Sequence, residues 1–174
     1  MQQQHPNKRG FKRKLSDDEL QNGVDIEARQ LNQYFTPPAL ARELTRGLID
    51  ILTAATQDYV FIEPSAGSGE FVRALTDCGI PADHVLAVEI DRNLCNKQTD
   101  WICADYLQCT AESLRLIEVP KSKRVVIGNP PCTRTGSWTR GGANSLGIQF
   151  LNHSAEIADT VGMILGIGVR RHHF

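Results

Sequence analysis

Hydrophobic positions in the first half of the chain alternate between helical spacing and short continuous runs. Apolar residues at helical intervals predict a helix over roughly 37–55, with Thr36 as its N-cap. A continuous apolar run over 59–62 then ends at Glu63, and a glycine-rich turn precedes a second helical stretch that stops before Gly79. This order of strand, loop and helix is typical of an α/β fold.

The same unit recurs along the rest of the chain. Short apolar runs predict strands at 85–88, 101–104, 125–127 and 161–165, and a helix is predicted near 146–157. Near-continuous apolar strands separated by helices are typical of a parallel sheet with both faces covered. The sequence therefore predicts a Rossmann-like, doubly wound α/β domain with about five parallel strands.

Length and composition narrow the class of protein. A chain of 174 residues allows one domain of ordinary size, and its hydrophobic share of 41% is that of a globular protein. No apolar run approaches the ~20 residues that span a bilayer, and the polar N-terminus has no apolar leader core. We therefore expect an intracellular protein, in the nucleus or the cytoplasm, without a membrane partner. The five cysteines contain no C-x-x-C pair, which predicts neither a disulfide framework nor a metal site.

Basic charge is concentrated at the N-terminus. Residues 1–16 contain five Lys or Arg and no acid, so the rest of the chain is acidic although the formal net charge is only −1. We expect residues 1–30 to form a disordered basic arm and residues 31–174 to form the folded domain. Such an arm can be a solubilising tail, a nuclear-import signal or a contact to nucleic-acid phosphates.

Acidic residues directly follow the first three predicted strands. Because ligands bind beyond the carboxyl ends of parallel strands, we expect Glu63, Glu89 and Asp105 to share a site. Glu89 lies about twenty positions after Gly67, where an acid can accept hydrogen bonds from ribose hydroxyls, and Asp105 can accept from an adenine amine. Either carboxylate could instead cap the helix that follows. Since Glu63 and Glu70 flank the glycine loop, a cationic or zwitterionic cofactor fits better than a pyrophosphate.

A proline-rich turn follows the fourth predicted strand. It reads Gly-Asn-Pro-Pro-Cys over 128–132. The two prolines fix the backbone and remove two donors, which leaves the Asn129 side chain and the backbone carbonyls as acceptors. Such a rigid group of acceptors can hold an amino group, whereas the alternative is an ordinary Asn-Pro turn.

With these motifs the chain resembles the amino-methyltransferases from Gln33 to about Leu165. These are class I S-adenosylmethionine-dependent methyltransferases of the N6-adenine type, which methylate the exocyclic amine of adenine in DNA or RNA. Residues 33–37 resemble the motif that closes over the methionine end of the cofactor, and 63–71 resemble the cofactor glycine loop. Residues 129–131 resemble the start of the catalytic N-P-P-aromatic motif.

The resemblance implies S-adenosyl-L-methionine as the cofactor and DNA or RNA as the substrate. It implies that Glu89 binds the ribose and that Asp105 and Tyr106 contact the adenine. The residues for which it implies cofactor contacts are Tyr34, Thr36, Glu63, Ser65, Ala66, Gly67, Gly69, Glu89, Ile90, Asp105, Tyr106 and Asn129. The implied catalytic residues are Asn129, Pro130, Pro131 and Cys132.

Two features depart from the family pattern. Cys132 stands where the family has an aromatic ring that stacks on the flipped base, and Trp138 could replace that ring. The family fold also continues past the fifth strand into a helix and an antiparallel hairpin. We therefore expect a C-terminally incomplete methyltransferase domain with an exposed apolar edge strand, covered by a partner subunit or by self-association.

Three other functions remain open from the sequence. Pro-Pro-Cys is typical of cytosine-C5 methyltransferases, in which the cysteine attacks the base. Methylation of a protein glutamine uses the same N-P-P chemistry on a side-chain amide. A shortened chain could also bind the cofactor without catalysing transfer.

Overall fold

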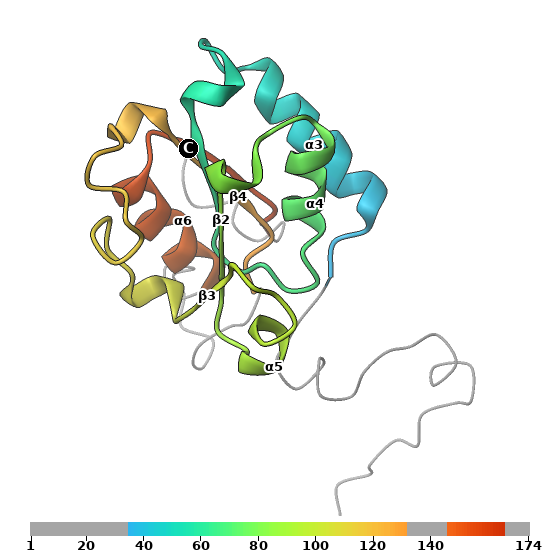
Figure 1. Ribbon diagram of the computed structural model, residues 1–174, viewed down its shortest axis with the longest axis vertical. Helices are drawn as coiled ribbons and strands as arrows, with labels where there is room; N and C mark the ends of the chain where they lie inside the picture. Colours follow the sequence, from blue (N-terminus) through green and yellow to red (C-terminus); the bar gives the residue numbers. More distant parts are fainter. Residues whose placement is uncertain (1–34, 132–145, 166–174) are drawn as a thin grey trace, which may run out of the picture.

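A computed structural model of the protein describes residues 35–131 and 146–165 (Figure 1). Its helices and strands alternate as predicted, except that only 3-10 turns separate the third strand from the fourth. The helices are α3 (Pro38–Asp50), α4 (Glu70–Asp77), α5 (Arg92–Cys95) and α6 (Leu146–Ile157). The strands are β1 (Val60–Glu63), β2 (Val85–Glu89), β3 (Ile102–Cys103), β4 (Arg124–Gly128) and β5 (Thr160–Met163). Short 3-10 turns lie at η1 (Thr56–Asp58), η2 (Ala82–His84), η3 (Tyr106–Gln108) and η4 (Lys121–Lys123).

The five described strands form one parallel sheet in the order β3-β2-β1-β4-β5. The chain runs outward from β1 to β3 and then crosses to the other side of β1 with β4. The strand order therefore reverses between β1 and β4, and doubly wound sheets bind their ligands beyond the carboxyl ends of the strands at such a point. The predicted Rossmann-like fold is confirmed.

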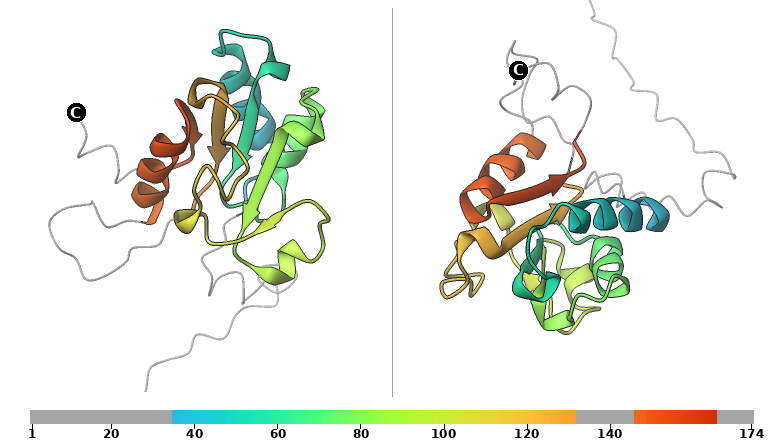
Figure 2. Two further views of the ribbon diagram at one scale, coloured as in Figure 1. Left: turned by 60° about the vertical axis from the view of Figure 1, so that its left-hand side comes forward. Right: turned by 90° about the horizontal axis from the view of Figure 1, so that it is seen from above.

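Helices cover both faces of the sheet (Figure 2). α3 and α4 pack with Phe61 and Val125 on one face, and α6 packs with Ile62 and Val126 on the other. Successive side chains of β1 and β4 thus enter opposite apolar cores, because side chains alternate along a strand. All four are fully buried, as expected of strands in a covered parallel sheet.

The first predicted helix is shorter than expected. It was predicted over 37–55 with Thr36 as N-cap, whereas α3 spans Pro38–Asp50 and its N-cap is Pro37. The second proline explains the later start: the residue before a proline is disfavoured in the helical region, and Pro37 is extended, with φ −57° and ψ 138°. At the other end the helix stops at Asp50, with Ile51 as its C-cap. Thr36 is buried ahead of the helix instead.

The outer strands are also shorter than predicted. The strand predicted over 101–104 is reduced to the two residues of β3, which pairs with β2, because Asp105 already caps η3. β5 ends at Met163 rather than at 165, and its residues are half-buried at the other edge of the described sheet. The predicted covering of this edge stays a prediction, and the predicted arm over 1–30 lies outside the described residues. No helix within the described ranges is long and apolar enough to cross a membrane.

Candidate active site

A cavity of about 620 Å³ lies at the carboxyl ends of the strands, where the strand order reverses. The loops after β1, β2, β3 and β4 all contribute to its walls. Of the predicted site residues, those in its lining are Thr36, Glu63, Ser65, Ala66, Gly67, Glu89, Ile90, Asp105, Tyr106, Asn129, Pro130 and Pro131. Tyr34, Cys132 and Trp138 lie outside the described residues, and Gly69 does not line the cavity.

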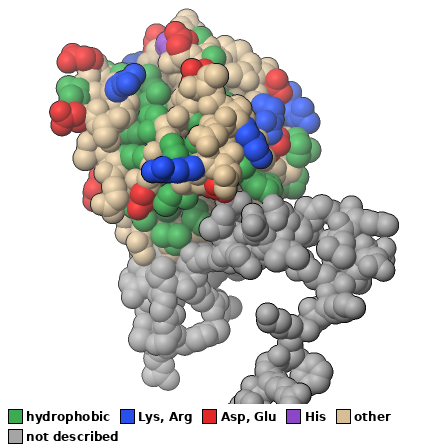
Figure 3. Space-filling view, turned by 60° about the horizontal axis from the view of Figure 1, so that its bottom comes forward, with side chains coloured by type: hydrophobic (Ala, Val, Ile, Leu, Met, Phe, Trp, Pro, Cys, Tyr) green, Lys and Arg blue, Asp and Glu red, His purple; other side chains and the backbone are tan. Residues whose placement is uncertain are grey.

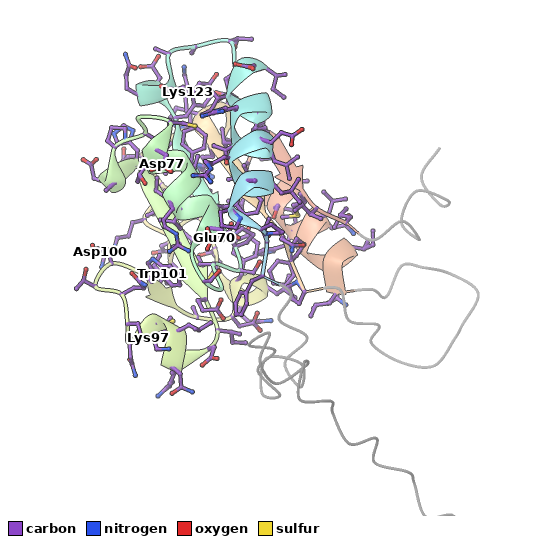
Figure 4. The ribbon with its side chains drawn as sticks, turned by 90° about the vertical axis from the view of Figure 1, so that its right-hand side faces the viewer. Glu70, Asp77, Lys97, Asp100, Trp101 and Lys123 are labelled. Atoms are coloured by element: carbon purple, nitrogen blue, oxygen red, sulfur yellow. The ribbon has the colours of Figure 1, made fainter. Side chains whose placement is uncertain are left out.

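The glycine loop owes its shape to two residues with positive φ. Gly67 has φ +53°, and a side chain there would lie 3.3 Å from the ring of Phe35, which covers the loop from the segment before α3. Gly69 has φ +83° and is the N-cap of α4, and a side chain there would meet the ring of Trp101. Figure 4 shows Trp101 near the start of α4, where Glu70 is labelled. Gly69 therefore shapes the turn between Ser68 and Glu70, which both line the cavity.

Glu89 connects the end of β2 to the glycine loop. Its side chain is only 5% exposed, and its Oε2 accepts a hydrogen bond of 2.7 Å from the backbone N–H of Gly67. Its Oε1 accepts from the N–H of Asp91 at 2.9 Å. A carboxylate oxygen has two acceptor positions, so each oxygen retains capacity for a hydroxyl donor. Glu89 is not the cap of the next helix, because Asp91 caps α5 by accepting from Asn93.

Asp105 does cap the element that follows it. One carboxylate oxygen accepts from the N–H of Leu107 at 3.0 Å, so Asp105 has the capping role that the sequence left open as an alternative. The side chain is nevertheless exposed at the rim of the cavity. Capping by one oxygen leaves the second oxygen to accept from a ligand amine.

Glu63 is the most buried acid of the site. Its side chain is 1% exposed and packs so closely on Gly128 that a Cβ there would overlap its Oε1. Burial raises the pKa of Glu63 from 4.5 to about 8; the N–H of Ser65 opposes this rise, and the charge of Glu89 adds to it. At neutral pH the carboxyl is therefore largely protonated, and a positive charge beside it would favour ionisation.

The N-P-P turn is joined to the glycine loop by a hydrogen bond. The hydroxyl of Ser65 donates to the backbone carbonyl of Asn129 at 3.3 Å, and the N–H of Ser65 donates to Glu63 at 3.2 Å. One residue thus contacts both the buried acid and the turn after β4. The loops after β1 and β4, which are 64 residues apart at this contact, meet in one site.

One aromatic residue of the cavity lining, Phe150, was missed in the sequence. Phe150 projects from α6 into the lining and stacks on Tyr106 with 5.5 Å between ring centroids. The hydroxyl of Tyr106 is hydrogen-bonded to Ser154 at 3.0 Å in the interior of the protein. Ile90, 68% exposed, adds apolar surface. Figure 3 shows apolar side chains gathered at this end of the molecule among charged groups.

Acidic groups outnumber basic groups in the lining. The Asp, Glu, Lys and Arg residues there are Glu63, Glu70, Glu89, Asp91, Arg92 and Asp105. Glu70 is paired with Arg73 on the outer side of the loop. The excess of carboxyl groups favours a ligand with positive charge over a pyrophosphate. Within the described ranges no group of three or more His, Cys, Asp or Glu side chains is placed to hold a metal ion.

Three solved structures share this arrangement of strands and helices. A complex of DrdV with DNA superimposes with a TM-score of 0.56 at 16% identity, over 82% of this chain and 21% of that chain. A Listeria monocytogenes protein described as a class I S-adenosylmethionine-dependent methyltransferase gives 0.53 at 12% identity, over 85% and 49%. The ATP-dependent Type ISP restriction-modification enzyme LlaBIII bound to DNA gives 0.50 at 16% identity, over 76% and 15%.

The chain shares a Rossmann-like fold with these proteins. It spans about half or less of the length of each of these three proteins, and at these identities the likeness is one of fold. No family model matches the sequence. The fold places the cavity where the strand order reverses, and the residues of that cavity carry the argument about its chemistry.

Proposed function

We propose that this chain binds S-adenosyl-L-methionine in the cavity and transfers its methyl group to the exocyclic amine of adenine in DNA or RNA. One observation carries the proposal: the Asn129-Pro130-Pro131 turn lies in the same cavity as Glu63 and Glu89. The hydrogen bond between Ser65 and Asn129 directly joins the glycine loop to this turn.

The residues of the cavity fit this cofactor. Its volume of about 620 Å³ lies within the ~300–1,000 Å³ typical of small-molecule sites. Glu89 has acceptor capacity left for ribose hydroxyls, Asp105 can accept from an adenine amine, and the apolar side chains of Ile90 and Phe150 can enclose a flat base. Glu63 and its acidic neighbours suit a molecule that carries a sulfonium and an ammonium group.

The N-P-P turn supplies acceptors for the substrate amine. When bound, S-adenosyl-L-methionine supplies an electrophilic methyl group. The lone pair of an adenine amine is delocalised into the ring, so acceptors at the Asn129 side chain and the Pro130 carbonyl would localise it and orient the nitrogen. Positioning and hydrogen bonding of this kind supply much of a catalytic effect. The chain needs no strong base, because the nitrogen becomes acidic once it is methylated and its proton can leave to water.

A nucleic acid is the substrate class favoured by the structural neighbours and by the charge of the N-terminal segment. Two of the structural neighbours, DrdV and LlaBIII, were solved with DNA. The N-terminal segment carries five basic residues without an acid, which can contact phosphates of DNA or RNA. We therefore propose the nucleic acid as the partner of this site, with the arm as a source of phosphate contacts.

Mass analysis of the product tests the proposal. The full chain is incubated with labelled S-adenosyl-L-methionine and with DNA, RNA or a glutamine-containing peptide, and the digests are analysed for methylated products. N6-methyladenine is expected, lost in Asn129→Ala and retained in Glu118→Gln, an exposed acid outside the cavity lining.

Three results would overturn the proposal in different ways. A methyl group on a cytosine carbon, lost in Cys132→Ser, would assign the cytosine-C5 reaction. A methyl group on glutamine alone would assign a protein substrate. Cofactor binding without transfer to any of these substrates would assign a non-catalytic cofactor-binding protein.

A further inference from the structure

We propose that Cys95 and Cys103 are a thiol pair that forms a reversible disulfide, and that this disulfide weakens the binding of the cofactor at Glu89. The second half rests on the proposed function. Neither cysteine lines the cavity, and no step of the proposed methyl transfer uses them.

The fold brings these two cysteines together from different elements. Cys95 ends α5, Cys103 lies in β3, and both elements pack at the carboxyl end of β2 (Figure 1). Cys103 is the register partner of Glu89 in the parallel pairing of β2 with β3. The thiol of Cys95 donates to the backbone carbonyl of Glu89 at 3.2 Å, so both cysteines lie beside Glu89, and Cys103 is near enough to raise the pKa of Cys95. Both thiols are free.

The two thiols differ in access and in acidity. Cys103 is exposed, whereas Cys95 is buried. Burial, together with the contact to Cys103, raises the pKa of Cys95 to about 12, so this group remains a thiol at neutral pH. An oxidant from solution therefore reaches Cys103 first, and Cys95 is placed to resolve the oxidised sulfur.

The oxidation balances with a hydroperoxide as the oxidant. The Cys103 sulfur attacks hydrogen peroxide and becomes a sulfenic acid, while water leaves. The Cys95 sulfur then attacks the sulfenic sulfur and loses its proton, and a second water leaves as the S–S bond forms. Two electrons pass from the two thiols to the peroxide, and a dithiol reductant reverses the change.

The bond would act on the cofactor site through α5. A disulfide draws the two sulfurs to ~2 Å, so Cys95 gives up its hydrogen bond to the Glu89 carbonyl. The N–H groups of Leu94 and Cys95 both donate to the carbonyl of Asp91, so a movement of the Cys95 backbone would also move Asp91. Asp91 in turn donates to the Glu89 carboxylate, and the Ile90–Arg92 segment lines the cavity.

Peptide mapping on the full chain tests whether the disulfide forms, and calorimetry tests whether it weakens cofactor binding. The protein is treated with hydrogen peroxide and mapped by mass spectrometry without reduction, and its affinity for S-adenosyl-L-methionine is measured before oxidation, after it and after dithiothreitol. We expect a Cys95–Cys103 linkage, a fall in affinity of at least tenfold, and recovery on reduction. Cys103→Ser should keep its affinity in peroxide. Cys78→Ser, which removes a half-buried cysteine outside the cavity, should behave as wild type.

Each other outcome contradicts a defined part of the proposal. Absence of the linkage, or linkage of other cysteines instead, overturns the thiol pair. A linkage that leaves the affinity unchanged overturns its effect on the site. If the reduced wild-type chain does not bind S-adenosyl-L-methionine, the proposed function and the regulatory half fall together, while the mapping still decides whether the thiols pair.

Discussion

Glu63 and Glu89 end neighbouring strands and are both buried, yet their surroundings differ. Glu89 accepts hydrogen bonds from two backbone N–H groups, those of Gly67 and Asp91, which satisfy a charged carboxylate. The Glu63 carboxylate accepts a longer bond of 3.2 Å from the N–H of Ser65, and the side chain packs against Gly128. Burial therefore dominates at Glu63 and raises its pKa.

The raised pKa of Glu63 predicts a loss of stability with rising pH. The unfolded carboxyl ionises near 4.5, whereas the folded one stays protonated up to about 8. The folded state therefore binds this proton more tightly than the unfolded state does. As a result, the free energy of unfolding of the wild type, compared with that of Glu63→Gln, falls between these two pH values and is constant above them. The expected fall is on the order of a few kcal/mol. Urea denaturation of both proteins from pH 5 to 9 measures this fall. If the free energies of unfolding of the two proteins changed with pH in the same way, Glu63 would ionise normally in the folded protein.

The sequence predicted the positions of these acids better than their environments. Glu63, Glu89 and Asp105 were placed at one edge because they follow successive strands, and all three line the cavity. Gly69 was assigned to the cofactor site with Gly67, but it faces Trp101. Phe150 carried no signal, because it belongs to the apolar face of a helix whose distance from the cavity depends on tertiary packing.

At the scale of elements, periodicity located the strands and helices and left their ends less certain. The helix predicted near 146–157 spans those residues, and β1 lies within one residue of its prediction. β3 is two residues long although four apolar positions were visible, because capping by Asp105 ends the strand. The extent of an edge strand depends on its neighbours, which a single sequence does not show.

α3 contains a buried hydroxyl whose removal we expect to stabilise the protein. Thr45 is a fully buried residue of α3, and its Oγ1 has no hydrogen-bond partner among the described residues. Thr45→Val keeps the shape and replaces the hydroxyl with a methyl group, so the free energy of unfolding should rise by about 1 kcal/mol. Thr76→Val is the matched control on α4, where the exposed hydroxyl donates to Arg73 and no gain is expected. A loss of stability in Thr45→Val, measured in urea, would contradict this.

At the scale of the whole molecule, the position of the cavity follows from topology. β1 and β4 are adjacent in the sheet, but β2 and β3 come between them in the chain. The loops after β1 and β4 therefore meet although they are distant in sequence, and Ser65 bonds to Asn129. The order of motifs along the chain was enough to predict this meeting, because a parallel sheet places all carboxyl ends at one edge.

The most direct test of the central claim is calorimetric titration of S-adenosyl-L-methionine into the wild-type chain, Glu89→Gln and Glu118→Gln. Glutamine retains one acceptor oxygen but loses the charge, so Glu89→Gln should weaken binding by roughly 1.5–3 kcal/mol, about 10- to 150-fold. Glu118 is exposed and outside the cavity lining, so Glu118→Gln should bind as the wild type does. Absence of binding by the wild-type chain, or equal affinities of the wild type and Glu89→Gln, would contradict the assignment of this cavity as the cofactor site.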